Sequence, residues 1–465
     1  MASASLASHL ALPLVASFAG AQTLWWPSAT ASAPRVVLVF IPGNPGLSSY
    51  YINFLHSIYS SKSLSSSSIE IVSISQRGHA PLPAVGDSPV WGDNLTNQKQ
   101  AAKGYGTRLQ DQVRHKVAVV DAIRRMYPDR EKTKLVVVGH SIGAWMAIET
   151  LKKRPEQVDG VHLLFPTLAW IGRTPNARRL RLLLNPVVRD VVLPLPLLML
   201  SMLPLFLLLR LVSLFTAQPL PAALATADLL KTPGAVRNAL RMAREEFKTV
   251  QGLETSTIET LRKFSADEEA ANKVQGRGYV RSYWASDEMD SWAPGWIRSQ
   301  VETELQLHRV HLPPSLNLSA ARSSASGRNG KEQTTPGRLR SNMRTRSFSV
   351  SEYRSSPGSI PNLRNAKAIR RPNGEIVIEA EINEPSSESE DDAQNLDTLD
   401  SHANGTGSSA NDRASQRALN YHLGRFRATS THCKIGMPHA FCVHHSDEMA
   451  QIVSHWISHD HLQKD

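Results

Sequence analysis

The chain has 465 residues, of which 41% are hydrophobic, so it is long enough to bury a sizeable core. Its formal net charge is +11, but many basic residues lie in a stretch rich in Ser and Asn or flank an apolar segment. This distribution argues against a nucleic acid as the main partner. Cys433 and Cys442 are too few for a disulfide framework and lack metal ligands at zinc spacing. We expect no metal and no cofactor.

The first part of the chain alternates predicted strands with predicted helices. Nearly continuous apolar, β-branched runs predict strands that are buried on both faces, and amphipathic spacing predicts the helix before the third strand. The predicted strands are 35–41, 69–75, 135–138 and 161–165, and the predicted helices are 50–59 and 109–126. This alternation is typical of an α/β protein with a doubly wound, mostly parallel sheet.

A Gly-x-Ser-x-Gly motif, residues 139–143, lies between the third predicted strand and an apolar segment that predicts a helix. In this strand–turn–helix context the motif predicts a nucleophile elbow, with Ser141 as the nucleophile. Side chains at the two glycine positions would collide with the neighbouring strand or helix. The turn also places the Ser141 hydroxyl at a helix N-terminus, where developing negative charge is stabilised. A Gly-Ser turn without a catalytic role is the alternative.

The segment 191–209 is uncharged and strongly apolar. It is long enough to suggest a membrane span, but Pro194, Pro196 and Pro204 interrupt it. We therefore expect a broken hairpin that inserts into one leaflet or lies on a phospholipid monolayer or membrane surface. A buried helical pair that covers the active site is the alternative. Six arginines near this segment are expected to meet phosphate head groups: Arg173, Arg178, Arg179, Arg181, Arg189 and Arg210.

The rest of the chain returns to the core only after a long insertion. Residues 220–273 are expected to be helical, and 278–284 to form a strand. From 313 to 420 the chain is rich in Ser, Arg, Asn and Gly, with basic residues first and acidic residues later. Such a composition buries too little apolar surface to offset chain entropy, so we expect disorder, apart from a strand-like segment at 375–382. The sequence does not identify protein partners for this insertion.

The last predicted strand is 430–435, and the final predicted helix is 447–457. The expected organisation has five parts: a first core part with the elbow (1–180), a helical, strongly apolar cap (181–277), the acid-bearing strand and loop (278–312), the disordered insertion (313–420), and the last strand, catalytic histidine and final helix (421–465).

A serine hydroxyl needs a base to take its proton. In this type of fold the acid and then the histidine follow the serine, each on a loop after a later strand. His439 has that position, between the last predicted strand and the last predicted helix. Several other histidines lie nearby and compete for the role on position alone: His432, His444, His445, His455, His459 and His461.

The acid should follow the predicted strand 278–284, and both Asp287 and Asp290 do. We favour Asp290 and keep Asp287 as the alternative acid, because either could orient the imidazole. The oxyanion hole needs two main-chain N–H groups. One is expected from Ile142, which follows the nucleophile, and the other from Asn44, which follows Pro-Gly in the turn after the first strand. A tight turn without this role is the alternative for that segment.

Nine segments together resemble the lipid droplet-associated hydrolase family. They are IPGNPG at 41–46, Tyr50-Tyr51 with Phe54, SQRGHA at 75–80, Leu109-Gln110 with His115-Lys116, GHSIG at 139–143, LLFPT at 163–167, TPN at 174–176, DSWAP at 290–294 and PHAF at 438–441. The resemblance implies an α/β-hydrolase fold, with Ser141 as nucleophile, Asp290 as acid and His439 as base. It also implies a lipid ester substrate such as a sterol ester, and association with lipid droplets and the endoplasmic reticulum.

The chain departs from the family pattern in two ways. A long insertion separates the acid from the histidine, and extra residues precede Asp290, which keeps Asp287 open. The sequence as a whole predicts a serine hydrolase that cleaves carboxylic esters of lipids through an acyl-enzyme and docks on a phospholipid surface through 191–209. The rival from another class is a lipid droplet-associated scaffold with a vestigial triad.

Overall fold

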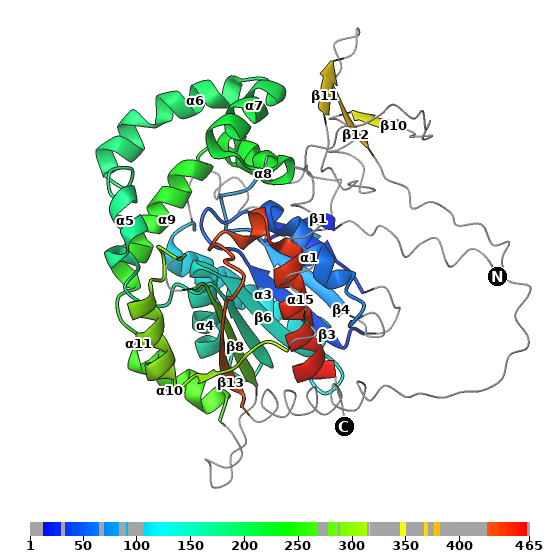
Figure 1. Ribbon diagram of the computed structural model, residues 1–465, viewed down its shortest axis with the longest axis vertical. Helices are drawn as coiled ribbons and strands as arrows, with labels where there is room; N and C mark the ends of the chain where they lie inside the picture. Colours follow the sequence, from blue (N-terminus) through cyan, green and yellow to red (C-terminus); the bar gives the residue numbers. More distant parts are fainter. Residues whose placement is uncertain are drawn as a thin grey trace, which may run out of the picture. The chain divides into compact units, whose positions relative to one another are not determined.

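The protein is described from a computed structural model (Figure 1). The described residues are 13–28, 33–64, 69–82, 90–91, 106–266, 278–286, 289–313, 316, 345–349, 367–370, 376–381 and 426–462. The chain divides into two compact units. Met1–Arg328 and Leu423–Asp465 form the first unit, and Asn329–His422 form the second. The sheet, the cap and all the predicted site residues belong to the first unit.

The sheet of the first unit has the strand order β5-β1-β2-β4-β3-β6-β7-β8-β13-β9. All neighbouring strands from β4 to β13 are parallel, and β1 and β2 extend the sheet as an antiparallel hairpin. The strands are β1 (Leu14–Phe18), β2 (Ala21–Trp26), β3 (Val36–Ile41), β4 (Ile69–Ile74), β5 (Val90–Trp91), β6 (Lys134–His140), β7 (Gly160–Leu164), β8 (Tyr279–Trp284), β9 (His308–Arg309) and β13 (Ala428–His432). This is an α/β-hydrolase sheet, so the predicted fold class is confirmed.

Helices cover both faces of the sheet. One face carries α3 (Leu109–Met126), α4 (Ile142–Lys153), α10 (Thr255–Phe264) and α11 (Gly295–Leu305), and the other carries α1 (Ile52–Tyr59) and α15 (Ser446–Ile457). The central strand β3 supplies both cores: Val37 and Val39 pack toward α3 and α4, whereas Leu38 and Phe40 pack toward α1 and α15. Burial on both faces explains why this strand is apolar at every position.

The cap lies between β7 and β8 in the sequence. It begins before the predicted bound of 181 and ends before α10, which packs on the sheet. It contains short turns of helix, η2 (Ile171–Arg173) and η3 (Val188–Val192), and the helices α5 (Pro175–Leu180), α6 (Pro194–Met202), α7 (Leu205–Thr216), α8 (Leu220–Lys231) and α9 (Ala235–Thr249). Pro204 separates α6 from α7, as expected for a broken apolar hairpin. In Figure 1 these two helices lie at the outer edge of the cap, away from the sheet.

The apolar hairpin is largely exposed. Helix α6 buries none of its residues, and α7 buries only Leu208 and Val212, which pack against α8. Leu214 and Phe215 at the end of α7 are 77% and 80% exposed. Within the described part of the chain, no helix by itself has the length and apolarity to cross a bilayer. Helices α7 and α8 taken together are long and apolar enough, but the pair is bent by 113°.

The flanking arginines divide into two groups. Arg173, Arg178, Arg179, Arg181 and Arg210 are exposed. Arg189, which we expected to meet lipid phosphates, is instead buried, and its guanidinium lies 2.5 Å from the carboxylate of Asp190. The expectation was wrong for this arginine because a neighbouring acid already neutralises it.

Most of the predicted insertion, 313–420, lies outside the described residues. In the second unit the structure describes an antiparallel sheet of β10 (Thr345–Ser349), β12 (Ile376–Glu381) and β11 (Lys367–Arg370), in that order. Strand β12 coincides with the expected strand-like segment 375–382.

Two predicted elements differ from the structure in detail, and one observed element was not predicted. The last strand begins two residues earlier than expected, at Ala428. The helical stretch 220–273 is divided into α8, α9 and α10, with Gly234 at a positive φ of 76° just before α9. Glycine adopts this conformation without a steric penalty, so the chain can turn there. The hairpin of β1 and β2 was not predicted.

Candidate active site

Ser141 lies in the sharp turn between β6 and α4. Its φ is 55° and its ψ is −125°, a conformation that residues other than glycine rarely adopt. A Cβ atom on Gly139 would lie 2.3 Å from the carbonyl oxygen of Gly143, and one on Gly143 would lie 2.2 Å from that of Ile41. Because such contacts are too short for any side chain, both positions require glycine. This is the geometry of a nucleophile elbow.

The structure brings Ser141, His439 and Asp290 together in one hydrogen-bonded line. His439 Nε2 lies 2.9 Å from Ser141 Oγ, and His439 Nδ1 lies 2.8 Å from Asp290 Oδ2. An ionised carboxylate only accepts hydrogen bonds, so Nδ1 carries the proton and Nε2 can accept the hydroxyl proton. This arrangement has the contacts that general-base activation of a serine requires.

The Asp290 carboxylate is fixed by its own loop. Its Oδ1 accepts hydrogen bonds from the main-chain N–H groups of Trp292 at 2.7 Å and Ala293 at 3.2 Å. Burial raises the pKa of this carboxyl, but His439 and the two N–H groups outweigh burial, so the pKa lies below its usual value. Asp290 is therefore ionised near neutral pH. The alternative acid, Asp287, lies outside the described residues.

The turn after β3 offers few N–H groups to an oxyanion. Pro42 and Pro45 have none, and the N–H of Gly43 points to Tyr51 Oη at 3.4 Å. Gly43 lies against the nucleophile, since a Cβ atom on it would be 2.9 Å from the Cβ of Ser141. Asn44 follows directly, and its main-chain N–H stays the predicted oxyanion donor from this turn. The other predicted donor, Ile142, is the first residue of α4.

His140 and Tyr51 connect this turn to the histidine loop. His140 Nε2 lies 2.9 Å from the carbonyl oxygen of His439, and His140 Nδ1 lies 2.7 Å from Tyr51 Oη. Because a carbonyl oxygen only accepts, Nε2 carries the proton and Nδ1 accepts the hydrogen bond from Tyr51. Burial, together with the neighbouring His439, lowers the pKa of His140 to about 3, which keeps the ring neutral. The motif contains His140, but no spacing rule predicted this role.

Two cap helices contact the core next to the site. The Asn44 side-chain amide donates to the carbonyl oxygen of Ala239 at 3.0 Å and to Glu246 Oε1 at 2.9 Å, both on α9. Tyr50 Oη lies 2.7 Å from Thr226 Oγ1 on α8. Burial raises the pKa of Glu246 to about 8, so its carboxyl is largely protonated at neutral pH. Sequence analysis did not identify Glu246, because a glutamate on an amphipathic helix predicts a solvated position.

The competing histidines do not share the contacts of His439. His432 Nε2 lies 2.6 Å from Glu302 Oε1, and His445 Nδ1 lies 3.5 Å from Glu448 Oε1. The imidazole that lies within hydrogen-bond distance of Ser141 Oγ is that of His439. Among the histidines that the sequence left open, the structure therefore places His439 at the nucleophile.

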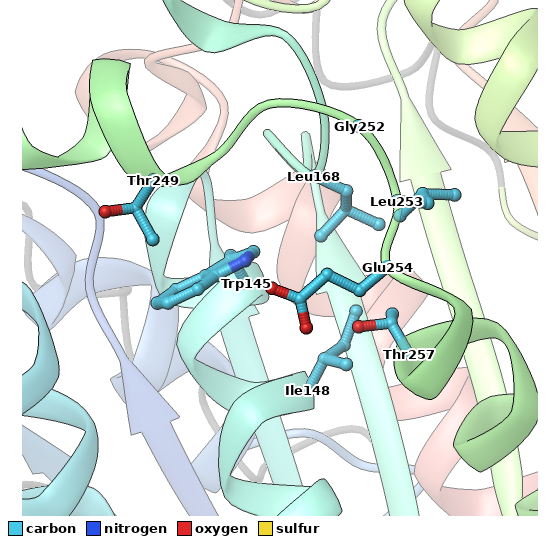
Figure 2. Close-up of a pocket in the computed structure, with 8 residues that line it drawn as sticks. All are labelled: Trp145, Ile148, Leu168, Thr249, Gly252, Leu253, Glu254 and Thr257. Carbon is cyan, nitrogen blue, oxygen red and sulfur yellow. The ribbon is translucent and has the colours of Figure 1, made fainter.

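A small pocket opens beside α4 (Figure 2). Trp145 and Ile148 of α4 form one side of it, and residues from the α9–α10 connection form the other. None of its lining residues is Ser141, His439 or Asp290. The candidate active site is therefore located by the hydrogen bonds of those three residues and not by this pocket. The pocket is lined by Trp145, Ile148, Leu168, Thr249, Gly252, Leu253, Glu254 and Thr257.

One group in the described part of the chain has the donor atoms of a metal site. The potential ligand atoms of His162, Asp460 and His461 lie within 4.8 Å of one another. The Asp460 carboxylate, however, is already paired with the buried Arg281 guanidinium at 2.5 Å and 2.8 Å. A divalent cation there would add two positive charges beside a buried guanidinium, which is unfavourable. We therefore assign these residues to the packing of the chain terminus on the sheet.

A family model described as lipid-droplet associated hydrolase matches residues 34–318. The chain belongs to this family. The match includes Ser141 and Asp290 and ends before His439. The family resemblance found in the sequence motifs is thereby confirmed.

Known family members match shorter parts of the chain. The lipid droplet-associated hydrolase of Homo sapiens is 35% identical over 147 residues, which are 31% of this chain and 42% of that protein. The lipid droplet-associated hydrolase of Gallus gallus is 29% identical over 232 residues, 48% of this chain and 66% of that protein. The chain thus spans less than half the length of the human relative.

Solved structures with a similar chain path include two hydrolases. One is 2-hydroxy-6-oxo-6-phenylhexa-2,4-dienoate hydrolase from a Rhodococcus species, with a TM-score of 0.37, 14% identity, and coverage of 62% of this chain and 83% of that chain. The other is a hydrolase from Oleispira antarctica, with a TM-score of 0.37, 10% identity, and coverage of 61% and 82%.

Proposed function

We propose that this member of the lipid droplet-associated hydrolase family cleaves carboxylic esters of lipids through an acyl-enzyme on Ser141. The observation that carries the proposal is the line from Ser141 Oγ to His439 Nε2 and from His439 Nδ1 to Asp290, with distances of 2.9 Å and 2.8 Å. Sterol esters are the substrates that we would test first, on lipid droplets and on the cytosolic face of the endoplasmic reticulum.

The proposed reaction has two halves. Ser141 Oγ attacks the ester carbonyl carbon while His439 Nε2 takes its proton, and the carbonyl oxygen becomes an oxyanion held by the N–H groups of Ile142 and Asn44. The C–O bond to the alcohol then breaks, and the alcohol leaves with the proton from His439. Water next attacks the acyl-enzyme with His439 as base, which releases the carboxylic acid and restores Ser141. Asp290 stabilises the imidazolium in both halves.

The catalytic part of the proposal has a direct test. Ser141→Ala should abolish hydrolysis of a short p-nitrophenyl ester, because it removes the nucleophile. The melting temperature should not fall, because the turn around residue 141 keeps its conformation. A fluorophosphonate probe should label the wild-type protein at Ser141 and leave the variant unlabelled. If the wild-type protein neither hydrolyses esters nor takes the label, the scaffold function with a vestigial triad becomes the better account.

We further propose that the exposed hairpin of α6 and α7 docks on a phospholipid monolayer. Contiguous exposed apolar surface of this kind marks an interaction site, and lipid is the partner that fits the family. Leu214 and Phe215 are more than three-quarters exposed, and Arg210 lies on the same helix, where it can meet head-group phosphates. Burying an exposed leucine or phenylalanine stabilises the bound state by about 1.5–3 kcal/mol each.

The docking surface can be tested separately from catalysis. The double variant Leu214→Asp, Phe215→Asp should reduce flotation with phospholipid-coated triacylglycerol droplets by tenfold or more, and short-ester hydrolysis should stay within twofold of wild type. Met126→Asp is a matched control, because Met126 is also an exposed apolar residue, at 43%, but lies outside the cap. Equal flotation of the double variant and the control would place the lipid-binding surface elsewhere.

A further inference from the structure

The side chain of Asn44 is held entirely by the cap. Its amide nitrogen has two hydrogens, and these point to the main-chain oxygen of Ala239 at 3.0 Å and to Glu246 Oε1 at 2.9 Å. Both acceptors belong to α9, whereas the main chain of Asn44 belongs to the turn after β3. One residue thus joins the proposed oxyanion donor to the cap.

Glu246 differs from the other residues of α9 that bind the core. Glu245 accepts a hydrogen bond from the N–H of Leu109 at 2.8 Å, and Asn238 donates to the carbonyl oxygen of Gly78 at 3.0 Å. These two contacts attach the cap to the core without touching the oxyanion turn. Glu246 is only 6% exposed, and its side chain contacts Asn44 itself.

The protonation state of Glu246 is compatible with an oxyanion that forms nearby during the proposed reaction. A carboxylate beside an oxyanion would repel it, but the buried Glu246 carboxyl is largely protonated at neutral pH, as described above. Protonated, it still offers Oε1 as an acceptor to the Asn44 amide. The contact can therefore hold Asn44 without adding a charge that opposes the reaction.

We propose that Glu246 is a positioning residue, which holds the Asn44 side chain so that the Asn44 main-chain N–H stays directed at the oxyanion. The inference rests on the proposed function, because it concerns the same reaction. A positioning role differs from simple cap packing in what it changes: it acts on the transition state, where the oxyanion exists, and hardly on substrate binding.

The test compares three single variants in the hydrolysis of a short p-nitrophenyl ester, which does not require lipid docking. Glu246→Ala should lower kcat by about ten- to a hundredfold, a part of the 10²–10³ that loss of a whole oxyanion donor costs, with KM within threefold. Glu246→Gln should retain at least a third of kcat, because its amide oxygen can accept the same hydrogen bond. Glu245→Ala removes a cap contact of similar strength elsewhere and should keep kcat within twofold.

Asn44→Ala keeps the main-chain N–H and removes the side chain that Glu246 holds. Its kcat should fall at least as far as in Glu246→Ala, because it also removes the hydrogen bond to Ala239. The double variant should lose little more than Asn44→Ala alone, since that variant already removes the contact with Glu246. This variant also decides the question if Glu246→Ala does not fold. Wild-type kcat in either alanine variant, a loss confined to KM, or an equal loss in Glu246→Gln and Glu246→Ala would overturn the inference.

Failure of the proposed function gives a different pattern. In that case the wild-type protein and Ser141→Ala would be equally inactive toward esters. The rate of fluorophosphonate labelling at Ser141 then replaces hydrolysis, because the phosphoryl oxygen needs the same N–H donors. Slower labelling in Glu246→Ala, with rescue in Glu246→Gln, would support the positioning role, and unchanged or absent labelling would refute it.

Discussion

Asp290→Asn is the substitution for which the structure makes the sharpest prediction. Oδ1 of Asp290 accepts two main-chain N–H groups, from Trp292 and Ala293, and Oδ2 accepts from His439. In the asparagine variant, the side-chain oxygen must stay with the two N–H groups, because an NH₂ group there would face two donors. The NH₂ group therefore faces His439 Nδ1.

This orientation reverses the tautomer of His439. Nδ1 of His439 must accept a hydrogen bond from the asparagine, so the ring proton moves to Nε2, which can no longer take the proton of Ser141. A wrong tautomer of this kind lowers turnover by about 10⁴ in a serine hydrolase triad. That corresponds to about 5.5 kcal/mol of activation free energy. The side chain keeps its size, so the melting temperature should change little.

The assay is kcat/KM for a short p-nitrophenyl ester, with Asp287→Asn as the matched comparison. We expect Asp290→Asn to lose about four orders of magnitude and Asp287→Asn to stay within threefold of wild type. If Asp290→Asn retained more than a tenth of the activity, the assignment of the acid would be wrong. A large loss in Asp287→Asn alone would transfer the role to Asp287.

Two further predictions concern stability. Tyr51→Phe leaves the Gly43 N–H and His140 Nδ1 buried without their partner. It should lower the free energy of unfolding, measured in urea, by about 1–3 kcal/mol. Tyr59→Phe is the control, since it loses only a partly buried hydrogen bond to Pro27 and should lower the free energy of unfolding by less. Folding raises the pKa of Glu246 from 4.5 to about 8, mainly through burial and, to a smaller extent, through Glu245, so the native protein keeps a proton that the unfolded chain releases in this interval. The free energy of unfolding should therefore fall as the pH rises from 4.5 to 8, and fall less in Glu246→Gln; equal slopes would contradict a buried, protonated carboxyl.

Much of the fold could be predicted because local patterns determine it. The apolar run of β3 requires burial on both faces, and the valine spacing of α3 requires one buried stripe, so both elements lie within one residue of the predicted bounds. The elbow was equally accessible, since only glycine fits at positions 139 and 143. Each of these constraints acts between residues that are close in the sequence.

The rest depends on contacts between distant segments. The choice between Asp287 and Asp290 could not be made by spacing, because both follow β8, and only the position of the His439 loop separates them. The contact of Glu246 with Asn44 joins residues 202 apart. No periodicity distinguishes a glutamate that is buried against another segment from one in solvent. The partner of Arg189, Asp190, lies just before the predicted apolar segment 191–209, and the arginines near that segment were weighed only against lipid phosphates.

The long insertion between the acid and the histidine leaves the site intact because of where it enters the sheet. Strand β13 pairs in parallel with β8 from Ala428 opposite Val280 to His432 opposite Trp284, so the two strands end level with each other. The Asp290 loop leaves one strand end and the His439 loop leaves the other, side by side. The entropy cost of closing a longer connection grows only with the logarithm of its length, so the paired strands can hold this register whatever the insertion contains. The hydrogen-bonded arrangement of Ser141, His439 and Asp290 is thus determined by strand pairing, and the insertion is free to differ from the family pattern without moving His439 away from Ser141.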